Sequence, residues 1–180
     1  MCIRDRSKLT LTARSALDIE SDAIVFSTNE QLLLTGGVGA ALLNRFGEPF
    51  QDAVSANIRG RDVAQCGDVF QFSSTITPWR HHFAVVAVDL SYHVSRVTID
   101  SILTNVLTTC SVSHDVRHVV TSALGTGYGD LPMPDFVDSL LAALSPDDPF
   151  SVTLALNSDD SLAVCTQHLD RAAPDAYVVS

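Results

Sequence analysis

The feature that most constrains this fold is a run of glycines between a buried strand and a helix. Residues 23–26 (Ala-Ile-Val-Phe) form a short continuous apolar run, which is typical of a strand covered on both faces. After residues 27–35 (STNEQLLLT), residues 36–39 (Gly-Gly-Val-Gly) stand directly before residues 40–46, whose composition favours a helix. A helix that opens out of a glycine-rich loop behind a buried strand indicates an α/β protein.

Strands and helices continue to alternate along the chain. A second apolar strand also leads into a glycine-rich loop and then into a helix. This order predicts a three-layer α/β/α sandwich with a mixed, largely parallel sheet. The predicted strands are residues 9–13, 23–26, 69–72, 83–88, 118–123 and 151–156, and the predicted helices are residues 40–46, 49–58, 99–110, 134–144 and 161–168.

Length and composition indicate one domain. A chain of 180 residues has the size of an ordinary globular domain, and its 46% hydrophobic content excludes a disordered acidic tail. No linker, repeat or low-complexity segment interrupts it, so we expect a single domain over residues 8–180. Residues 1–7 (MCIRDRS) show no periodicity, and we interpret them as an appended or mis-called start.

Charge narrows the range of partners. The chain has 21 acidic and 11 basic residues, a net charge of −10, which disfavours DNA and RNA because both need a field of lysine and arginine. Lys8 is the only lysine, so a P-loop lysine is excluded. A phosphate site in this chain has to use arginine or backbone N–H groups.

The remaining composition indicates no membrane span, metal or cofactor. The longest apolar run, residues 83–88, is far shorter than the ~18–20 residues that cross a bilayer, and no apolar leader segment follows the basic start. The four cysteines form no CxxC pair, which disfavours a zinc site or a disulfide framework. We therefore expect a soluble, cytoplasmic protein.

The two glycine-rich loops, residues 36–39 and 124–132, are the strongest candidates for a binding site. In an open α/β sheet the carboxyl ends of parallel strands meet at one edge, where ligands bind. Helix N-termini and consecutive backbone N–H groups bind anions there, so two such loops predict a clamp for a diphosphate. A dinucleotide fingerprint at residues 37–42 fails, because Leu42 holds the place of its last glycine or alanine.

These residues resemble the macro domain family. Its first motif is similar to DAIVFSTNEQLLLTGGVGAALL (residues 22–43), and its second is similar to TSALGTGYGDLPM (residues 121–133). The order of strands agrees over about residues 8–156. The segment VAVDLSYHVSRVTIDSIL (residues 86–103), followed by the second motif, resembles a bacterial branch of the family.

The resemblance implies that the chain binds ADP-ribose, free or attached to a protein. It matches Asn29 to an asparagine that contacts the distal ribose, and an asparagine offers ribose hydroxyls both a donor and an acceptor. It matches the two glycine-rich loops to the walls that hold the ribose and the diphosphate. The ligand-binding residues that it implies are Asn29, Gly36, Gly37, Val38, Gly39, Gly125, Thr126, Gly127, Tyr128 and Gly129.

The match departs from the family at the nucleoside and ribose ends. Phe26 replaces the first asparagine of the motif. The aspartate that reads adenine has no clear counterpart, and either Ser15 or Asp18 is a candidate for its role. The aromatic residue near the distal ribose falls on Gly129, and the adjacent Tyr128 is the expected substitute.

A second departure concerns catalysis, because some macro domains hydrolyse ADP-ribose esters or glycosides. The catalytic aspartate of one hydrolytic branch would fall on Gly39, which performs no acid–base chemistry. Asn29 remains the candidate catalytic residue, whereas Asp89 and Asp130 are expected to be loop or capping residues. A slow hydrolase of ADP-ribosyl groups or O-acetyl-ADP-ribose is therefore the alternative function, and a protein- or RNA-interaction module with a degenerate site is a third.

Overall fold

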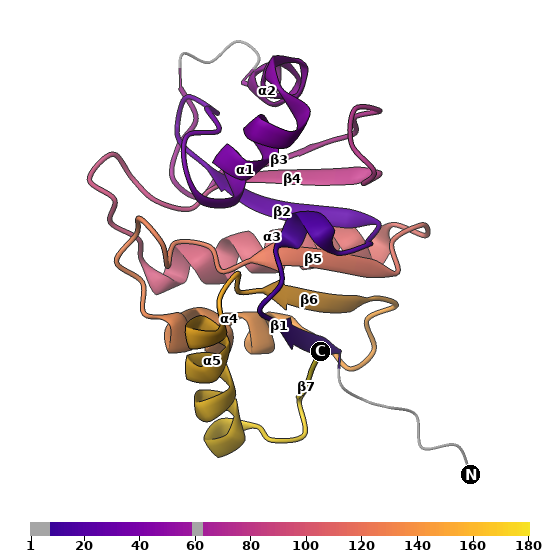
Figure 1. Cartoon of the computed structure of the whole chain (residues 1–180), viewed down its shortest axis with the longest axis vertical. Helices are drawn as coiled ribbons and strands as arrows, with labels where there is room; N and C mark the ends of the chain where they lie inside the picture. The colour runs from indigo at the N-terminus through magenta and orange to yellow at the C-terminus, as the bar shows by residue number, and fades with distance from the viewer. Residues whose placement is uncertain (1–7, 59–62) are drawn as a thin grey trace.

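The computed structural model describes residues 8–58 and 63–180, so the segment interpreted as an appended start lies outside the described residues. Within these residues, seven strands form one sheet in the order β3-β4-β2-β5-β6-β1-β7 (Figure 1). The strands are β1 (Leu9–Thr12), β2 (Ala23–Thr28), β3 (Val69–Phe72), β4 (His81–Val86), β5 (His118–Ser122), β6 (Ser151–Ala155) and β7 (Tyr177–Val179). The helices are η1 (Ala16–Asp18), α1 (Gly37–Phe46), α2 (Glu48–Ser55), α3 (Arg96–Val112), α4 (Met133–Ala143) and α5 (Asp159–Ala172).

The sheet is mixed and largely parallel, as predicted. Among the described strands, only β3 runs antiparallel to its neighbour β4, and every other pair is parallel. Val25 in β2 is paired with Phe83 in β4 on one side and with Thr121 in β5 on the other. The carboxyl ends of β4, β2, β5 and β6 therefore emerge next to one another at one edge of the sheet.

Helices cover both faces of the sheet and give three layers (Figure 1). The alternation of side chains in β2 shows why both layers are needed, because Ala23 and Val25 belong to one core and Ile24 and Phe26 to the other. The first core contains residues of α3, α4 and α5, and the second contains residues of α1 and α2. The predicted α/β/α sandwich is confirmed.

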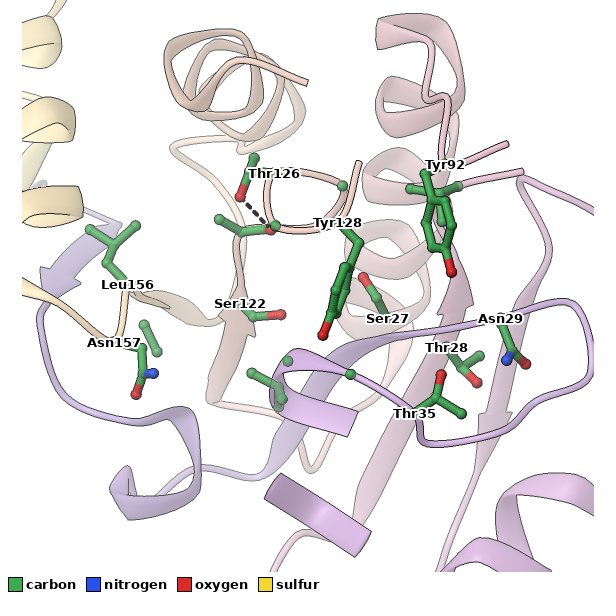
Figure 2. A pocket seen from close by; sticks show the side chains of 18 of the residues that line it. Ser27, Thr28, Asn29, Thr35, Tyr92, Ser122, Thr126, Tyr128, Leu156 and Asn157 are labelled. Atoms are coloured by element: carbon green, nitrogen blue, oxygen red, sulfur yellow. Dashed lines mark hydrogen bonds between the residues drawn. The ribbon is translucent and has the colours of Figure 1, made fainter. Parts of the chain in front are cut away.

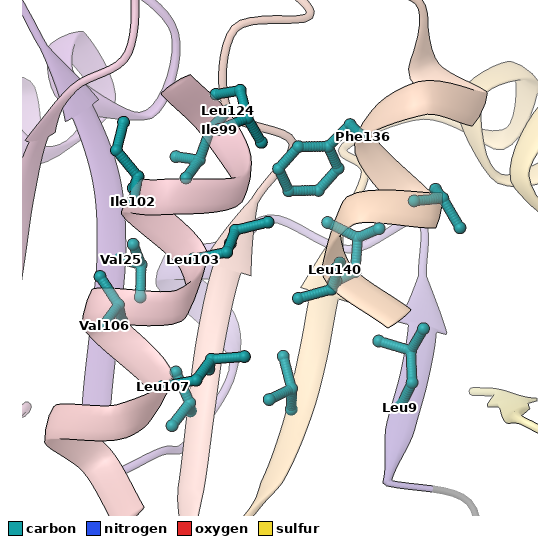
Figure 3. Packing of buried hydrophobic residues seen from close by; sticks show 14 of the residues in the cluster. Leu9, Val25, Ile99, Ile102, Leu103, Val106, Leu107, Leu124, Phe136 and Leu140 are labelled. Atoms are coloured by element: carbon teal, nitrogen blue, oxygen red, sulfur yellow. The ribbon is translucent and has the colours of Figure 1, made fainter. Parts of the chain in front are cut away.

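Helix α3 carries the predicted helical periodicity. Its buried residues recur at the spacing of three and four that places them on one face, toward the sheet. Figure 3 shows residues 99–107 of this face in one cluster with Phe136 and Leu140 of α4 and Val25 of β2. The buried residues of this face are Ile99, Ile102, Leu103, Val106, Leu107 and Cys110.

Several boundaries differ from the sequence-based expectations. Helix α1 begins at Gly37, so the second and third glycines of the run form its first turn rather than a loop before it. Helix α5 extends over 14 residues where a short helix is predicted, and η1 and β7 are not predicted at all. Strand β7 is a three-residue edge strand with two exposed valines, too short to show an alternating pattern. No helix within the described ranges is long and apolar enough to cross a bilayer.

A histidine lies fully buried in the aromatic core beneath α2. The His82 ring stacks on Phe72, with 4.9 Å between the ring centroids, and also lies against Phe50 and Trp79. Its Nε2 is 2.5 Å from Thr77 Oγ1 and its Nδ1 is 3.3 Å from the Phe72 carbonyl oxygen. Burial lowers the pKa of His82 from its ordinary value of 6.5 to about 4.

This buried histidine predicts a loss of stability in mild acid. The folded state holds His82 neutral while the unfolded chain protonates it, so its contribution is complete above about pH 6.5 and lost as the pH falls toward 4. Between about pH 8 and about pH 5 this group alone should lower the free energy of unfolding by ~2 kcal/mol. Urea denaturation of the wild type and His82→Gln at both pH values measures it. An equal pH dependence in the two proteins would contradict the assignment.

Candidate functional site

A pocket of about 420 Å³ lies at the edge of the sheet where β4, β2, β5 and β6 end. Its lining follows the order of these strands across the sheet, from Tyr92 beyond β4, through Asn29 beyond β2 and Gly125–Tyr128 beyond β5, to Asn157 beyond β6. Figure 2 shows Asn29, Thr28 and Tyr92 at one end of the pocket and Leu156 and Asn157 at the other. The pocket is therefore elongated across the carboxyl ends of four parallel strands, the expected position for a ligand in such a sheet.

Asn29 shapes the loop after β2 with its side chain. The N–H groups of Gln31 and Leu33 both donate to Asn29 Oδ1, at 3.0 and 2.9 Å. Because an amide oxygen has two lone pairs, these two bonds occupy its acceptor capacity. We therefore expect Asn29 to offer a ligand its Nδ2 hydrogens as donors, because its acceptor oxygen is already used by the loop.

The first glycine run supplies the N-terminus of α1. Gly36 is the N-cap in an extended conformation, and the Ala40 N–H donates to its carbonyl oxygen as the first turn closes. The N–H groups of Gly37, Val38 and Gly39 precede that bond and so have no partner within the helix. Gly37 and Val38 line the pocket, which places the positive end of the α1 dipole there.

The second glycine loop presents N–H groups from the opposite wall. Both the hydroxyl and the N–H of Thr126 donate to the Ala123 carbonyl oxygen, at 2.9 and 3.4 Å, and the Leu131 N–H donates to the Gly125 carbonyl oxygen. Within the described part of the chain, these bonds leave the N–H groups of Gly127 and Tyr128 without a partner. Both residues line the pocket, so two free N–H groups lie opposite α1.

The two loops touch through an aromatic ring. The Tyr128 side chain lies against Gly36, and a Cβ atom on Gly36 would collide with the ring. Gly129 is equally constrained, because a Cβ atom there would collide with the Gly125 carbonyl oxygen. Glycine is therefore required at position 129 by the tight path of its own loop, whereas a side chain at position 36 would have to displace the exposed Tyr128 ring.

Eight of the ten predicted ligand-binding residues line the pocket. The two that do not are Gly39, which is buried near the Ser27 carbonyl oxygen and Leu34, and Gly129, which lies inside the second loop. The structure gives these two a packing role, and a ligand contact for them stays a prediction. The eight that line it are Asn29, Gly36, Gly37, Val38, Gly125, Thr126, Gly127 and Tyr128.

The adenine candidates do not line the pocket. Ser15 caps η1, where its Oγ accepts a hydrogen bond from the Leu17 N–H at 3.3 Å. The Asp18 carboxylate is 2.9 Å from the Arg45 guanidinium, and both side chains are about half exposed. Asn157, which comes soon after β6, lines the pocket instead, at the end opposite Asn29 and Tyr92.

Several lining residues were missed by sequence reasoning. They include hydroxyl side chains at strand ends, the serines at positions 27 and 122, together with Tyr92 and Asn157. The signal for the serines was available, since Ser27 directly follows the apolar run of residues 23–26 and Ser122 is the last residue of β5, at the same sheet edge. Tyr92 had no such signal, because its position depends on the folding of the loop after β4.

Strained backbone gathers around this pocket. Among the described residues, Leu32, Tyr92 and Asn157 are the non-glycine residues with positive φ, at 55°, 60° and 59°. Each lies in a loop that follows a strand at the pocket's edge of the sheet, and this conformation costs ~1–2 kcal/mol for residues such as Leu32 and Tyr92, whereas asparagine tolerates it better. Such strain concentrates at functional sites, where the surrounding structure holds it in place.

The two candidate carboxylates, Asp89 and Asp130, organise loops and do not line the pocket. Asp89 Oδ1 accepts hydrogen bonds from the N–H groups of Ser91 and His93, at 2.8 and 2.9 Å. Asp130 accepts from the Val94 N–H at 3.0 Å and lies 2.8 Å from His93 Nδ1. These hydrogen bonds, from Val94 first and then from His93, lower the pKa of Asp130 below its usual range, and Asp130 in turn raises the pKa of His93.

The pocket wall carries no charged side chain. None of its lining residues, all within the described ranges, is an aspartate, glutamate, histidine, lysine or arginine. Residues 8–58 and 63–180 also contain no group of three or more histidine, cysteine, aspartate or glutamate side chains arranged to hold a metal ion. The site is built from backbone N–H groups, hydroxyls, amides and aromatic rings.

Known structures share this architecture. A macrodomain of Oceanobacillus iheyensis, the G37V mutant with ADPR, superposes with a TM-score of 0.79 at 16% identity over 91% of this chain and 92% of that one. The Trypanosoma brucei macrodomain in complex with ADP-ribose gives a TM-score of 0.74 at 16% identity over 88% of this chain and 67% of that one. The O. iheyensis macrodomain with MES bound gives 0.76 at 18% identity over 89% of each chain. At these identities the likeness establishes the fold alone.

The sequence itself carries the family assignment. No curated protein matches the chain significantly. The family model described as "Macro domain" matches residues 25–139, a stretch that includes most of the strand β2, both glycine-rich loops and most of α4. That match spans more than half of the 180 residues and confirms the resemblance seen in the two motifs, so this chain belongs to the macro domain family.

Proposed function

We propose that this protein binds ADP-ribose in the pocket at the carboxyl edge of the sheet. The observation that carries the proposal is the pair of facing loops: Gly37, Val38, Gly127 and Tyr128 line one cavity, and their N–H groups have no hydrogen-bond partner among the described residues. Consecutive N–H groups and a helix N-terminus bind phosphate oxygens without a lysine. The macrodomains of O. iheyensis and T. brucei that share the fold have ADP-ribose in their structures, which supports the same ligand here.

The shape of the pocket supports an assignment for each part of the ligand. The diphosphate lies between the two glycine loops, and the distal ribose lies at the Asn29 end, where the Nδ2 hydrogens donate to a hydroxyl. The nucleoside then lies toward Leu156 and Asn157, on the other side of the loops. A volume of about 420 Å³ falls within the usual range for small-molecule sites of ~300–1,000 Å³.

Recognition is better supported than catalysis. A hydrolase needs a group that takes a proton from water, within about 3 Å of the reacting atom. The pocket lining, as described above, holds no carboxylate or imidazole, and Asn29 Oδ1 is already occupied by two N–H donors. We therefore place ADP-ribose recognition first, whether the ligand is free or attached to a protein, and treat turnover as a minor activity. The formed pocket also disfavours an interaction module with a degenerate site.

We also propose that the protein works in the cytoplasm. Cys66, Cys110 and Cys165 are free thiols, which is the usual state in a reducing compartment. Burial raises the pKa of Cys110 to about 12 and that of Cys165 to about 11, so both remain unreactive thiols.

Gly127→Glu should abolish binding and leave the fold intact. A Cβ atom at this position meets no atom within 4 Å, and the backbone φ is not positive, so a side chain is tolerated by the protein. The carboxylate would enter the diphosphate site and repel it, lowering the affinity for ADP-ribose by about 100-fold or more. Calorimetric titration measures the affinity, with Gly127→Ala as the matched control that should change it by only about twofold. Wild-type affinity in Gly127→Glu would refute the site.

Salt should leave the affinity unchanged or improve it. A doubly negative ligand approaches a chain of net charge −10 and meets no arginine or lysine in the pocket lining. Raising ionic strength from about 0.01 M to about 0.15 M screens the long-range repulsion. Titrations at the two concentrations measure the effect. A clear weakening with salt would show instead that a basic side chain contacts the ligand, with Arg45 and Arg80 the first to mutate.

Hydrolysis of ADP-ribosylated aspartate or glutamate, or of O-acetyl-ADP-ribose, should be slow. The loss of a general base typically costs about 10²–10⁴ in rate, and the pocket lining lacks one. Single-turnover assays should show residual release that depends on Asn29 and changes little in Asp89→Asn or Asp130→Asn. Fast release that collapses in either aspartate variant would reveal a catalytic carboxylate.

A further inference from the structure

We infer that Tyr92 is a specificity-determining residue, which covers the distal sugar and lets the pocket distinguish ADP-ribose from ADP. The inference rests on the proposed function, because it assigns a role within the same pocket. Tyr92 lies in the loop after β4, which belongs to neither glycine run.

The sheet order places Tyr92 at the sugar end of the pocket. It follows β4, which pairs with β2 on the side away from β5 and β6. If the diphosphate lies between the loops after β2 and β5 and the nucleoside lies toward Asn157, the group attached beyond the second phosphate is the part of the ligand that extends toward Tyr92. Figure 2 shows the Tyr92 ring extending toward the end of the pocket where Asn29, Thr28 and Thr35 lie.

The Tyr92 ring also stands beside the ring of the second loop. The centroids of Tyr92 and Tyr128 are 6.1 Å apart with an interplanar angle of 40°. Both side chains are largely exposed, at 59% and 72%, although they line a pocket. Two exposed rings at a pocket mouth leave apolar surface for a ligand to bury, and their hydroxyls remain free to hydrogen-bond with a polar sugar.

The loop that carries Tyr92 is built to hold it in an unfavourable conformation. Tyr92 has φ 60°, a left-handed value that tyrosine rarely adopts. Asp89 fixes it from both directions, because the Tyr92 N–H donates to the Asp89 carbonyl oxygen at 3.0 Å and the Asp89 N–H donates to the His93 carbonyl oxygen at 3.0 Å. Together with the two bonds to Asp89 Oδ1, these contacts define the loop without help from the ring itself.

Asp130 joins this loop to the second glycine loop. Its carboxylate receives the Val94 N–H and lies against His93 Nδ1, while its own position is two residues after Tyr128. The two tyrosines are therefore held on one hydrogen-bonded unit rather than on independent loops. Asp89 and Asp130 are positioning residues in this arrangement, and Tyr92 makes the contact.

The chemistry of the ligand separates the two nucleotides. ADP ends at its second phosphate, whereas ADP-ribose adds a pentose with apolar C–H faces and hydroxyl groups. A tyrosine supplies a flat apolar face and a polar tip, which matches such a group. ADP should therefore bind through the two glycine loops alone, and ADP-ribose should gain from Tyr92 in addition.

The test is the ratio of affinities for ADP-ribose and ADP, measured by calorimetry on Tyr92→Gly, Tyr92→Phe and the wild type. Tyr92→Gly removes the ring and at the same time relieves the positive φ, so the loop keeps its backbone path. We expect it to weaken ADP-ribose by about 5- to 10-fold and ADP by less than about twofold. Tyr92→Phe should lose only the part due to the hydroxyl. Leu90→Ala, in the same loop but 82% exposed and away from the pocket lining, is the matched control and should change neither affinity.

Each outcome separates the two proposals. Wild-type protein that binds neither nucleotide refutes the proposed function and this inference with it. Wild-type protein that binds both, with Tyr92→Gly weakening them equally or not at all, refutes the role of Tyr92 and leaves the proposed function standing. Thermal denaturation of Tyr92→Gly verifies that it folds, and a melting temperature at or above the wild-type value is expected once the strain is relieved.

Discussion

Burial of the central strands on both faces is the constraint on which this structure depends. Side chains of β2 and β4 alternate between two separate hydrophobic cores. A shift of one residue in the pairing register of either strand would therefore move each of its side chains into the opposite core. The register of these strands is therefore strongly specified, and so is the position of each strand's carboxyl end relative to those of its neighbours. The loops that build the pocket inherit their relative positions from that register. A site made of four loops from distant parts of the sequence is kept in order by the packing of residues such as Val25 and Phe26, which lie beneath it.

The second determinant is the source of positive potential in a negatively charged protein. With a net charge of −10 and no basic residue on the pocket wall, attraction for an anion has to come from oriented main-chain dipoles. The N-terminus of α1 and the free N–H groups of the second loop provide it at short range. The acidic surface then acts at long range against every anion alike, so specificity for a particular nucleotide lies in contacts inside the pocket. This division explains why one chain combines an acidic composition with a site suited to phosphate.

Much of the fold was predictable because its signals are local. Continuous apolar runs predicted β2, β4 and β6 to within two residues, and helical spacing predicted α3. Strand β7 was not predictable, since three residues at an edge carry too little pattern, and the first turn of α1 was misjudged because glycine gives no helical signal. The site divides in the same way. The glycine loops could be recognised from their residue types. The hydrogen bonds of Asn29 Oδ1 to its own loop and the position of Tyr92 could not, because both depend on contacts between loop residues that the residue type at one position does not indicate.

The reliance of this pocket on main chain has a consequence for how its importance would be measured. Truncating a side chain removes nothing from a wall whose donors are the N–H groups of residues 37, 38, 127 and 128, since every replacement except proline keeps them. A conventional alanine scan would therefore find few sensitive positions and suggest a site of little importance. The informative substitutions are those that add side-chain atoms to a glycine rather than those that remove them, because a bulky or charged side chain at such a position fills the cavity. For the same reason, random substitution in nature would rarely erode this site gradually; it would be lost in single steps, at the few positions where a new side chain fills it.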